Sequence, residues 1–210
     1  MPGALAERHI FELDGGTLAL DFVNTVSGLR PTRPLEKLLG YEDLVYWAEQ
    51  VGLLAAPQAA KLHNMRKLEP GRAERAFKWA VTVREALHDV FLASIEHRPP
   101  PLEALGALNA WIAAALSKRR IRPAGGGRFE AVFEDDGDLL AFLRPVAGDA
   151  ARLLESGAPV RLCAEAEQGR CGWLFLDDTK NHSRRFCTMK ECGNRAKQRR
   201  HYQRKRVAQP

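Results

Sequence analysis

The position of the cysteines constrains this chain more than any other feature, because all four lie after residue 160 of 210. They form two pairs, Cys163 with Cys171 and Cys187 with Cys192, with seven and four residues inside the pairs and fifteen between them. Clustered cysteines in a reducing compartment are more often metal ligands than disulfides. Two such pairs can surround a tetrahedral ion. The spacing therefore predicts one structural Zn²⁺ bound by four thiolates, and four buried free thiols are the alternative.

Two histidines in the same part of the chain, His182 and His201, keep the ligand set open. Zinc also accepts imidazole nitrogen, and the gaps inside the pairs are wider than the two-residue gap of a tight zinc knuckle. Either histidine could therefore replace one cysteine. We favour the four cysteines, because four ligands suffice.

The charge is as unevenly distributed as the cysteines. Between Lys180 and Arg206 there are eleven lysines and arginines and one acid, Glu191, so this segment carries +10. Because the whole chain carries +6, the rest of it carries −4. Such asymmetry is typical of a segment that binds a polyanion, and a charge run kept only for solubility is the alternative.

The residues around the cysteines predict a small aromatic core and a basic helix. Trp173 to Leu176 is expected to be a strand with Trp173 and Phe175 on one face, where they and the metal replace a larger core. After Gly193 no helix breaker occurs before Arg206, so a helix is expected there. Its cations surround it, and like charges four residues apart destabilise a helix by about 0.2–0.5 kcal/mol per pair. A phosphate backbone would remove this repulsion, and a frayed solvated tail is the alternative.

The candidate nucleic-acid contacts are the polar and basic residues of this region. Most are expected to touch phosphate, which gives affinity and little sequence information. Asn194 and Arg195 have side chains suited to base edges, although helix capping is the favoured role of Asn194. The full set is Arg184, Arg185, Asn194, Arg195, Lys197, Arg199, Arg200 and Arg204.

Apolar periodicity predicts that the part before the cysteines is mostly helical. It contains enough residues to bury a core of its own. The expected helices run from Tyr41 to Val51, from Ala56 to Leu68, from Gly71 to Glu96, from Leu102 to Leu116 and from Pro145 to Ser156.

Turn residues predict two small hairpins and a loop in the same part. One hairpin, or a strand that leads into a turn, is expected at residues 11–20, with the turn at 14–16. The other hairpin joins 129–133 to 139–143 through a turn near Asp136-Gly137. The segment Arg30–Pro34 is expected to be a loop, because its two prolines interrupt either ladder. Residues 21–26 fit a strand or a helix equally well.

Together these elements predict an α+β protein of two parts. Residues 1–158 would form a mostly helical domain with small hairpins, and residues 159–210 a zinc module that ends in a basic helix. Asp21, Asn24 and Thr25 interrupt an apolar stretch, so they either line a small-molecule pocket or bond to turn backbone. No nucleophile–base arrangement or phosphate loop is visible, and we expect no enzyme. No secretory signal or bilayer-length apolar run is visible either, so the expected location is the cytoplasm.

Three stretches of the C-terminal part resemble the CGNR-type zinc finger: Cys171-Gly-Trp-Leu-Phe-Leu-Asp177, Ser183-Arg-Arg-Phe-Cys187-Thr-Met189 and Cys192-Gly-Asn-Arg195-Ala-Lys197. Two further stretches, Gly15-Gly-Thr-Leu-Ala-Leu-Asp-Phe-Val-Asn-Thr25 and Asp43-Leu-Val-Tyr-Trp47, resemble the domain that precedes this finger in bacterial stress-induced transcription regulators. The resemblance implies zinc ligands at all four cysteines. The first gap, between Cys163 and Cys171, is longer than the resemblance leads us to expect, so His182 and His201 stay open as replacements for Cys163.

The combined expectation is a stress-response transcription regulator with one structural zinc. Its partners would be double-stranded DNA, a small-molecule effector and a second copy of the chain, without a membrane. An RNA-binding or ribosome-associated protein is one alternative, since a basic zinc module serves either polyanion. The other is an enzyme whose basic tail only localises it, with its pocket near Asp21 and Asn24.

Overall fold

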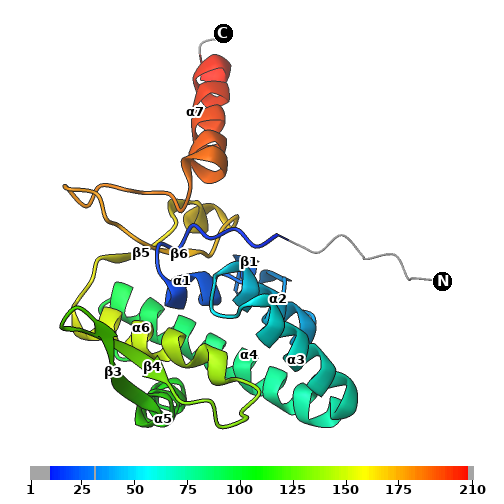
Figure 1. The fold of residues 1–210 in the computed structure, drawn as a ribbon. Coiled ribbons are helices and arrows are strands. Elements are labelled where there is room, and N and C mark those ends of the chain that lie inside the picture. Colours follow the sequence, from blue (N-terminus) through cyan, green and yellow to red (C-terminus); the bar gives the residue numbers. More distant parts are fainter. Residues whose placement is uncertain (1–9, 31, 208–210) are drawn as a thin grey trace.

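The computed structural model describes residues 10–30 and 32–207, and helices form most of this part of the chain (Figure 1). The strands of the described residues form separate antiparallel pairs, β1 with β2, β3 with β4 and β5 with β6. In chain order the elements are α1 (Leu18–Val23), β1 (Val26–Leu29), β2 (Arg33–Glu36), α2 (Tyr41–Gln50), α3 (Ala56–Leu68), α4 (Pro70–Ile95), α5 (Leu102–Ser117), β3 (Arg119–Gly125), β4 (Arg128–Phe133), α6 (Arg144–Glu155), β5 (Val160–Leu162), β6 (Leu174–Leu176) and α7 (Asn194–Val207). The predicted fold class, mostly helical with small hairpins and a C-terminal basic helix, is confirmed.

The long helix α4 is the centre of the helical part, because α1, α2, α3 and α5 all pack against it. α6 completes the bundle by packing on α1 and α5. The core between these helices holds an aromatic cluster in which the Phe22 ring lies 5.3 Å from Trp47 and 6.4 Å from Trp111, measured between ring centroids. Phe22 and Trp47 are fully buried. Aromatic rings of this size contribute much of the area that a core removes from water.

Each of the five helices predicted from periodicity is present, and its ends lie within one residue of the prediction. Glycines with positive φ follow two of them, Gly52 at +77° after α2 and Gly157 at +61° after α6. Glycine adopts this conformation without the steric penalty of other residues, so it ends a helix readily. No helix of the described residues is long and apolar enough to cross a membrane.

The hairpin predicted at residues 11–20 is wrong, because α1 begins inside it. The Asp14-Gly15-Gly16 turn leads into a helix instead of a second strand. The side chain of Thr17 caps α1 by accepting from the N–H of Leu20, and the carboxylate of Asp21 accepts from the N–H of Gly15. These side chains satisfy backbone groups that a helix start leaves free.

The loop predicted at Arg30–Pro34 and the partner predicted for strand 129–133 are wrong as well. β2 begins at Arg33 and includes Pro34, which a two-stranded ribbon tolerates because each strand has an edge without a ladder. β4 pairs with β3 through the Gly125–Gly127 turn, and residues 141–143 form a 3₁₀ helix that leads into α6. All three glycines of that turn have positive φ. These glycines therefore form the turn of the β3–β4 hairpin.

The strand β6 joins the helical part to the cysteine-rich part. One edge of β6 pairs with β5. On the other edge, the Asn24 side chain donates to the carbonyl of Leu174 (2.8 Å) and accepts from its N–H (3.0 Å), and the N–H of Leu176 donates to the carbonyl of Gly15 (2.8 Å). Asn24 is buried at the end of α1. Its side-chain amide makes the two hydrogen bonds that a neighbouring strand would make with Leu174.

We predict that Asn24→Ala destabilises the protein by about 2–4 kcal/mol, because it leaves a buried N–H and a buried carbonyl of Leu174 without partners. Asn64→Ala, on the exposed side of α3, is the matched control and is expected to change stability by less than about 0.5 kcal/mol. Urea unfolding of both variants measures the difference. Equal stabilities would show that the bond between Asn24 and β6 does not hold the two parts together.

Candidate metal centre and nucleic-acid surface

The four cysteines converge on one buried point. One ligand atom from each of Cys163, Cys171, Cys187 and Cys192 lies within 4.8 Å of all the others. The Sγ atoms of Cys171 and Cys187 are 3.8 Å apart, and those of Cys187 and Cys192 are 3.6 Å apart. A disulfide needs about 2.05 Å between sulfurs, so these are separate thiols.

These separations fit a metal ion. Four sulfurs at the zinc–thiolate distance of about 2.3 Å from a tetrahedral centre lie about 3.8 Å from one another. Contacts with the neighbouring thiols, first among them Cys163, raise the pKa of Cys171 and Cys187, and burial raises both further. Four thiolates cannot share this volume without a cation. The cysteines are thus positioned to hold one metal ion, and a single structural zinc would cross-link the two pairs.

Each ligand is placed by a short local structure. Cys163 follows β5, and its N–H continues the ladder by donating to the carbonyl of Trp173. Cys171 follows a 3₁₀ helix, residues 164–168, that ends at Gly169 with φ +65°. Cys187 lies in the returning loop, and Cys192 lies in a π-helical turn, residues 189–193, directly before α7. The last ligand therefore fixes the start of the basic helix.

The histidines left open by the sequence are not in the cluster. His182 Nδ1 lies 3.0 Å from the carbonyl oxygen of Asp177, and His201 is exposed on α7. Among the described residues the metal-ligating group consists of the four cysteines, Cys163 included. The longer gap between Cys163 and Cys171 is taken up by the 3₁₀ helix, which brings the chain back to the same point.

The aromatic residues of the insert form the core of this module, as predicted. Trp173 and Phe175 are buried with the four cysteines, and Phe186 packs against them. Gly172 lies so close to β1 that an added Cβ would be 2.7 Å from the carbonyl oxygen of Gly28. The indole N–H of Trp173 donates to the carbonyl of Val26 (3.1 Å). The metal cluster is thus packed directly on the first hairpin of the helical part.

Arg184, predicted as a nucleic-acid contact, has partners inside the protein instead. Its guanidinium lies 4.5 Å from the centre of the Phe175 ring and donates to the backbone carbonyls of Asp14, Leu176, Phe186 and Cys187. The guanidinium has several N–H donors, and here they connect the segment before α1, strand β6 and the loop at Cys187. The sequence does not show this, because the carbonyl partners depend on the folded loop.

Arg199 also has a protein partner. Its guanidinium forms a two-point ion pair with the fully buried carboxylate of Glu165, at 2.9 and 2.6 Å. Hydrogen bonds from Arg199 lower the pKa of Glu165. Bidentate pairs of this kind have fixed geometry. Sequence analysis missed Glu165, which lies two residues after Cys163 and attaches α7 to the metal centre.

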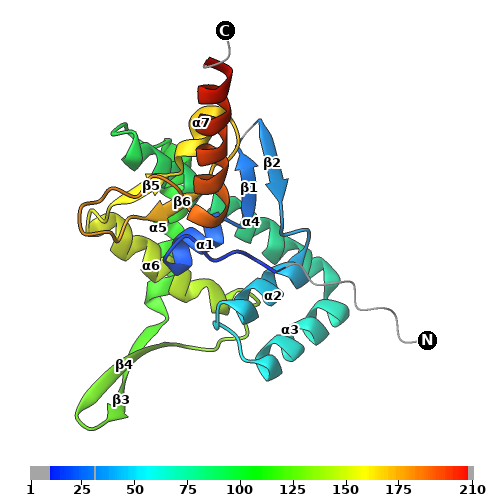
Figure 2. The same cartoon turned by 90° about the horizontal axis from the view of Figure 1, so that it is seen from above.

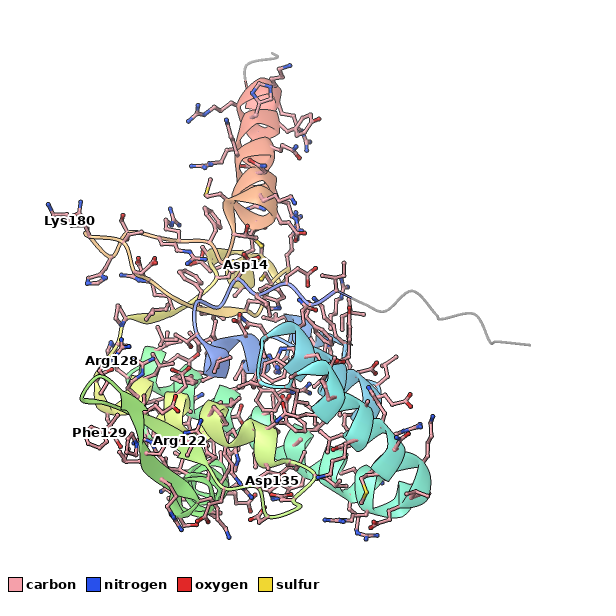
Figure 3. The ribbon with its side chains drawn as sticks, in the orientation of Figure 1. Asp14, Arg122, Arg128, Phe129, Asp135 and Lys180 are labelled. Atoms are coloured by element: carbon pink, nitrogen blue, oxygen red, sulfur yellow. The ribbon has the colours of Figure 1, made fainter. Side chains whose placement is uncertain are left out.

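The remaining predicted contacts lie on the accessible surface, Arg185 in the loop before Cys187 and the others on α7. Ala196 is the buried residue in the first turn. The side chain of Asn194 donates to the carbonyl of Lys190 (3.0 Å) in the preceding π-helical turn, whereas an N-cap would accept from an N–H of α7. Arg195 is 3.9 Å from Glu191, a loose exposed pair. The exposed cations of the set are Arg185, Arg195, Lys197, Arg200 and Arg204. Lys180, by contrast, lies at the far tip of the preceding loop, away from α7 (Figure 3).

The sequence left a ligand pocket and bonds to turn backbone open as alternatives for Asp21, Asn24 and Thr25, and in the structure each of these side chains bonds to protein. Asn24 bonds to β6, and Thr25 donates to the carbonyl of Phe22 and accepts from the buried Arg84. Burial raises the pKa of Asp21 to about 6, although the N–H of Gly15 donates to its carboxylate. Buried polar groups need such partners, and the partners here are backbone and Arg84.

We predict that the purified protein contains one zinc per chain. Cys163→Ser is expected to lower the zinc content and to lower the free energy of unfolding by several kcal/mol, because the binding free energy of a structural zinc is about 10–16 kcal/mol. His201→Ala is the matched control and is expected to keep both. Elemental analysis and thermal unfolding with a chelator measure the two quantities. Loss of zinc in His201→Ala with retention in Cys163→Ser would show that the histidine is the fourth ligand.

Comparison with known families agrees with this geometry. Residues 16–157 match the ABATE family, described as "Putative stress-induced transcription regulator", and residues 160–205 match the CGNR zinc finger. A search of curated proteins found no match. The first match covers more than half of the chain, and the second contains all four cysteines. The chain therefore belongs to the ABATE family, and its C-terminal part is a CGNR zinc finger.

Proposed function

We propose that this protein is a transcription regulator that binds double-stranded DNA through α7 and acts in the cytoplasm. The observation that supports this proposal is a helix with many exposed cations, attached at its start to the cysteine-rich module. α7 projects from the rest of the molecule (Figure 1), and its exposed cations have few protein partners. Its first turns are attached to the metal centre through Cys192, Ala196 and Arg199.

The shape of α7 suits the major groove of DNA. The helix extends from Asn194 to Val207, which at about 1.5 Å per residue is about 20 Å. The major groove, about 12 Å wide, admits an α-helix. No apolar stripe is available to pack α7 on the body, and its like charges would repel without a partner. Phosphates on both sides of a groove offset this repulsion from more than one direction.

The contacts that we propose are Arg185, Arg195, Lys197, Arg200 and Arg204. They are the predicted residues that stay exposed, and we omit Arg184 and Arg199 because their guanidinium groups are bonded within the module. Asn194 is omitted as well, because its side chain bonds to the carbonyl of Lys190. Phosphate contacts of this kind give affinity and orientation.

Two other functions remain as rivals. An RNA-binding or ribosome-associated role uses the same cations, and the family matches, a regulator family and a zinc finger, favour DNA. An enzyme with its site near Asp21 and Asn24 is disfavoured, because both side chains are bonded to backbone there.

We predict that affinity for a duplex falls steeply with salt, with a log–log slope of about −4.5 for five phosphate contacts. Arg200→Gln is expected to weaken binding several-fold and to reduce the slope by about 1. Fluorescence anisotropy of a labelled duplex measures both. Lys67→Gln, exposed on α3, is the control and should leave both unchanged. A flat salt dependence contradicts the phosphate contacts, and displacement by hairpin RNA at lower concentrations than by duplex DNA favours the RNA-binding rival.

We also propose a site for a small-molecule effector, at a different place from the pocket that the sequence suggested. A cavity of about 500 Å³ lies between α4, α5 and the segment before α6. One wall is aromatic, since Trp79 is 42% exposed and stands edge-on to Trp111 with 6.2 Å between ring centroids. Cavities with an apolar wall and a few convergent polar groups are the usual ligand sites.

The charges that line this cavity favour an anion. Its acids are Asp136 and Asp138, and both are bonded to Arg144. Arg144, followed by Lys118, holds the pKa of Asp136 well below its usual range. Arg72 and Arg75 add two more cations to the lining, so the cations outnumber the acids. Arg75 is one helical turn before Trp79, where it can bind the acid group of a planar ligand whose ring stacks on the indole.

We predict that 2-naphthoate binds this cavity and quenches tryptophan fluorescence. Arg75→Gln is expected to weaken its binding by about tenfold or more, because a charge-assisted hydrogen bond is lost. It should not affect the neutral analogue 2-naphthalenemethanol. Lys78→Gln, on the exposed face of the same helix, is the matched control. Absence of saturable quenching, or equal affinities in Arg75→Gln and the wild type, would show that the cavity takes no such ligand.

A further inference from the structure

The β3–β4 hairpin extends from the helical body, and among the residues that the structure describes no helix or strand covers it (Figure 2). Every residue of β3 is exposed, as are the first four residues of β4. Ile121 is 62% exposed and Phe129 is 69% exposed, and Phe129 and Arg128 point away from the body (Figure 3). A two-stranded hairpin alone is marginally stable in water. Pairing with another strand would therefore stabilise this exposed hairpin and bury its large apolar side chains.

The hydrogen-bond pattern shows which backbone groups of the hairpin are free to pair. The N–H of Glu134 donates to the carbonyl of Lys118 (3.0 Å), which continues the β3–β4 ladder. In an antiparallel ladder bonded pairs alternate with non-bonded pairs. Glu130 and Val132 therefore bond toward β3. The N–H and C=O groups of Phe129, Ala131 and Phe133 point outward, along the free edge of β4.

The two edges of the hairpin differ. On β3 the outward positions include Pro123, which has no N–H, and the register shifts between Pro123 and Gly125. A proline and a bulge are features by which proteins prevent edge pairing. β4 contains neither, and its Phe-Glu-Ala-Val-Phe sequence is rich in residues that favour strands. The edge of β4 is the one open to another strand.

The sequence of this edge is complementary to itself. Residues 128–134 read Arg-Phe-Glu-Ala-Val-Phe-Glu. If two copies pair antiparallel about a two-fold axis at Ala131, Arg128 faces Glu134 of the partner subunit and Phe129 faces Phe133 of the partner subunit, each twice. Opposite charges and aromatic pairs directly across strands stabilise a sheet. The small side chain at the axis leaves room for the second copy.

Neighbouring registers lack this complementarity. An axis at Glu130 would place this carboxylate opposite its own copy. An axis at Val132 would place the Glu130 carboxylate opposite Glu134 of the partner subunit. Like charges directly across strands are destabilising. The charges therefore select the axis at Ala131, in which the outward N–H and C=O groups also face each other.

We propose that two copies of this protein associate through β4, whose free edges pair antiparallel into a four-stranded sheet in the order β3, β4, β4 of the partner, β3 of the partner. The contact is one short strand pair, well below the about 1,600 Å² of a standard stable interface. The dimer therefore forms at micromolar and higher protein concentrations. It does not depend on nucleic acid, so it is tested independently of the proposed DNA binding.

Sedimentation velocity of the full chain without nucleic acid, over about 1–100 µM, is the test. We expect the sedimentation coefficient of the wild type to rise with concentration. Ala131→Pro removes one outward N–H of β4 and should remain monomeric. Ile121→Pro is the matched control, because Ile121 lies opposite Ala131 in the ladder and its N–H faces the other edge. It should dimerise like the wild type. A monomeric wild type, or equal behaviour of the two proline variants, overturns the proposal.

Charge reversal tests the register itself. Arg128→Glu places two glutamates across the interface and is expected to raise the dimer dissociation constant by tenfold or more. Adding Glu134→Arg restores the pair in the opposite sense and should return the constant to within about threefold of the wild type. Circular dichroism confirms that each variant is folded. If the double variant is weaker than Arg128→Glu alone, the proposed register is wrong.

Discussion

The orientation of the whole C-terminal part depends on the hydrogen bonds along the outer edge of β6. Asn24 bonds to both backbone groups of Leu174, and Gly15 bonds to Leu176. Successive side chains of a strand point to opposite sides. Leu174 consequently enters the core of the helical part, while Trp173 and Phe175 enter the core around the cysteines. One three-residue strand thus belongs to two cores, and the two parts are packed together at this strand.

A short series of contacts connects β6 to α7 and sets the direction of this helix. Cys163 continues the β5–β6 ladder, Glu165 follows it, and the Glu165 carboxylate binds Arg199 on the second turn of α7. A metal ion at the four cysteines would fix Cys192, directly before the helix, from the other side. These two points are seven residues apart, about two helical turns, so together they would hold the axis of α7 relative to the helical body.

The sequence predicted the elements whose signal is local. α2 to α6 show apolar periodicity and clear stops, and the cysteines were identifiable from residue type and spacing. α1 was missed because Asp14-Gly15-Gly16 suits a hairpin turn and a helix start equally, and only the bonds of Thr17 and Asp21 decide. The roles of Arg184 and Arg199 were beyond sequence, because carbonyls and a distant carboxylate become their partners only in the folded module. A count of charges cannot separate such cations from free ones.

This division of the cations bears on how tightly one chain can bind. Arg184 and Arg199 stabilise the module, so the proposed phosphate contacts of a single chain are five of the exposed cations around α7, namely Arg185, Arg195, Lys197, Arg200 and Arg204. Nonspecific affinities from such contacts are typically about 10⁻⁴–10⁻⁶ M at physiological salt. In a dimer with two-fold symmetry, binding of one α7 to DNA would hold the second α7 at a high effective concentration near the same DNA. This raises the affinity of the dimer without new contacts. The two-fold symmetry of such a dimer would also match that of a palindromic DNA site. A short self-complementary strand, weak in isolation, is sufficient for this purpose, because the DNA itself would hold both copies close together.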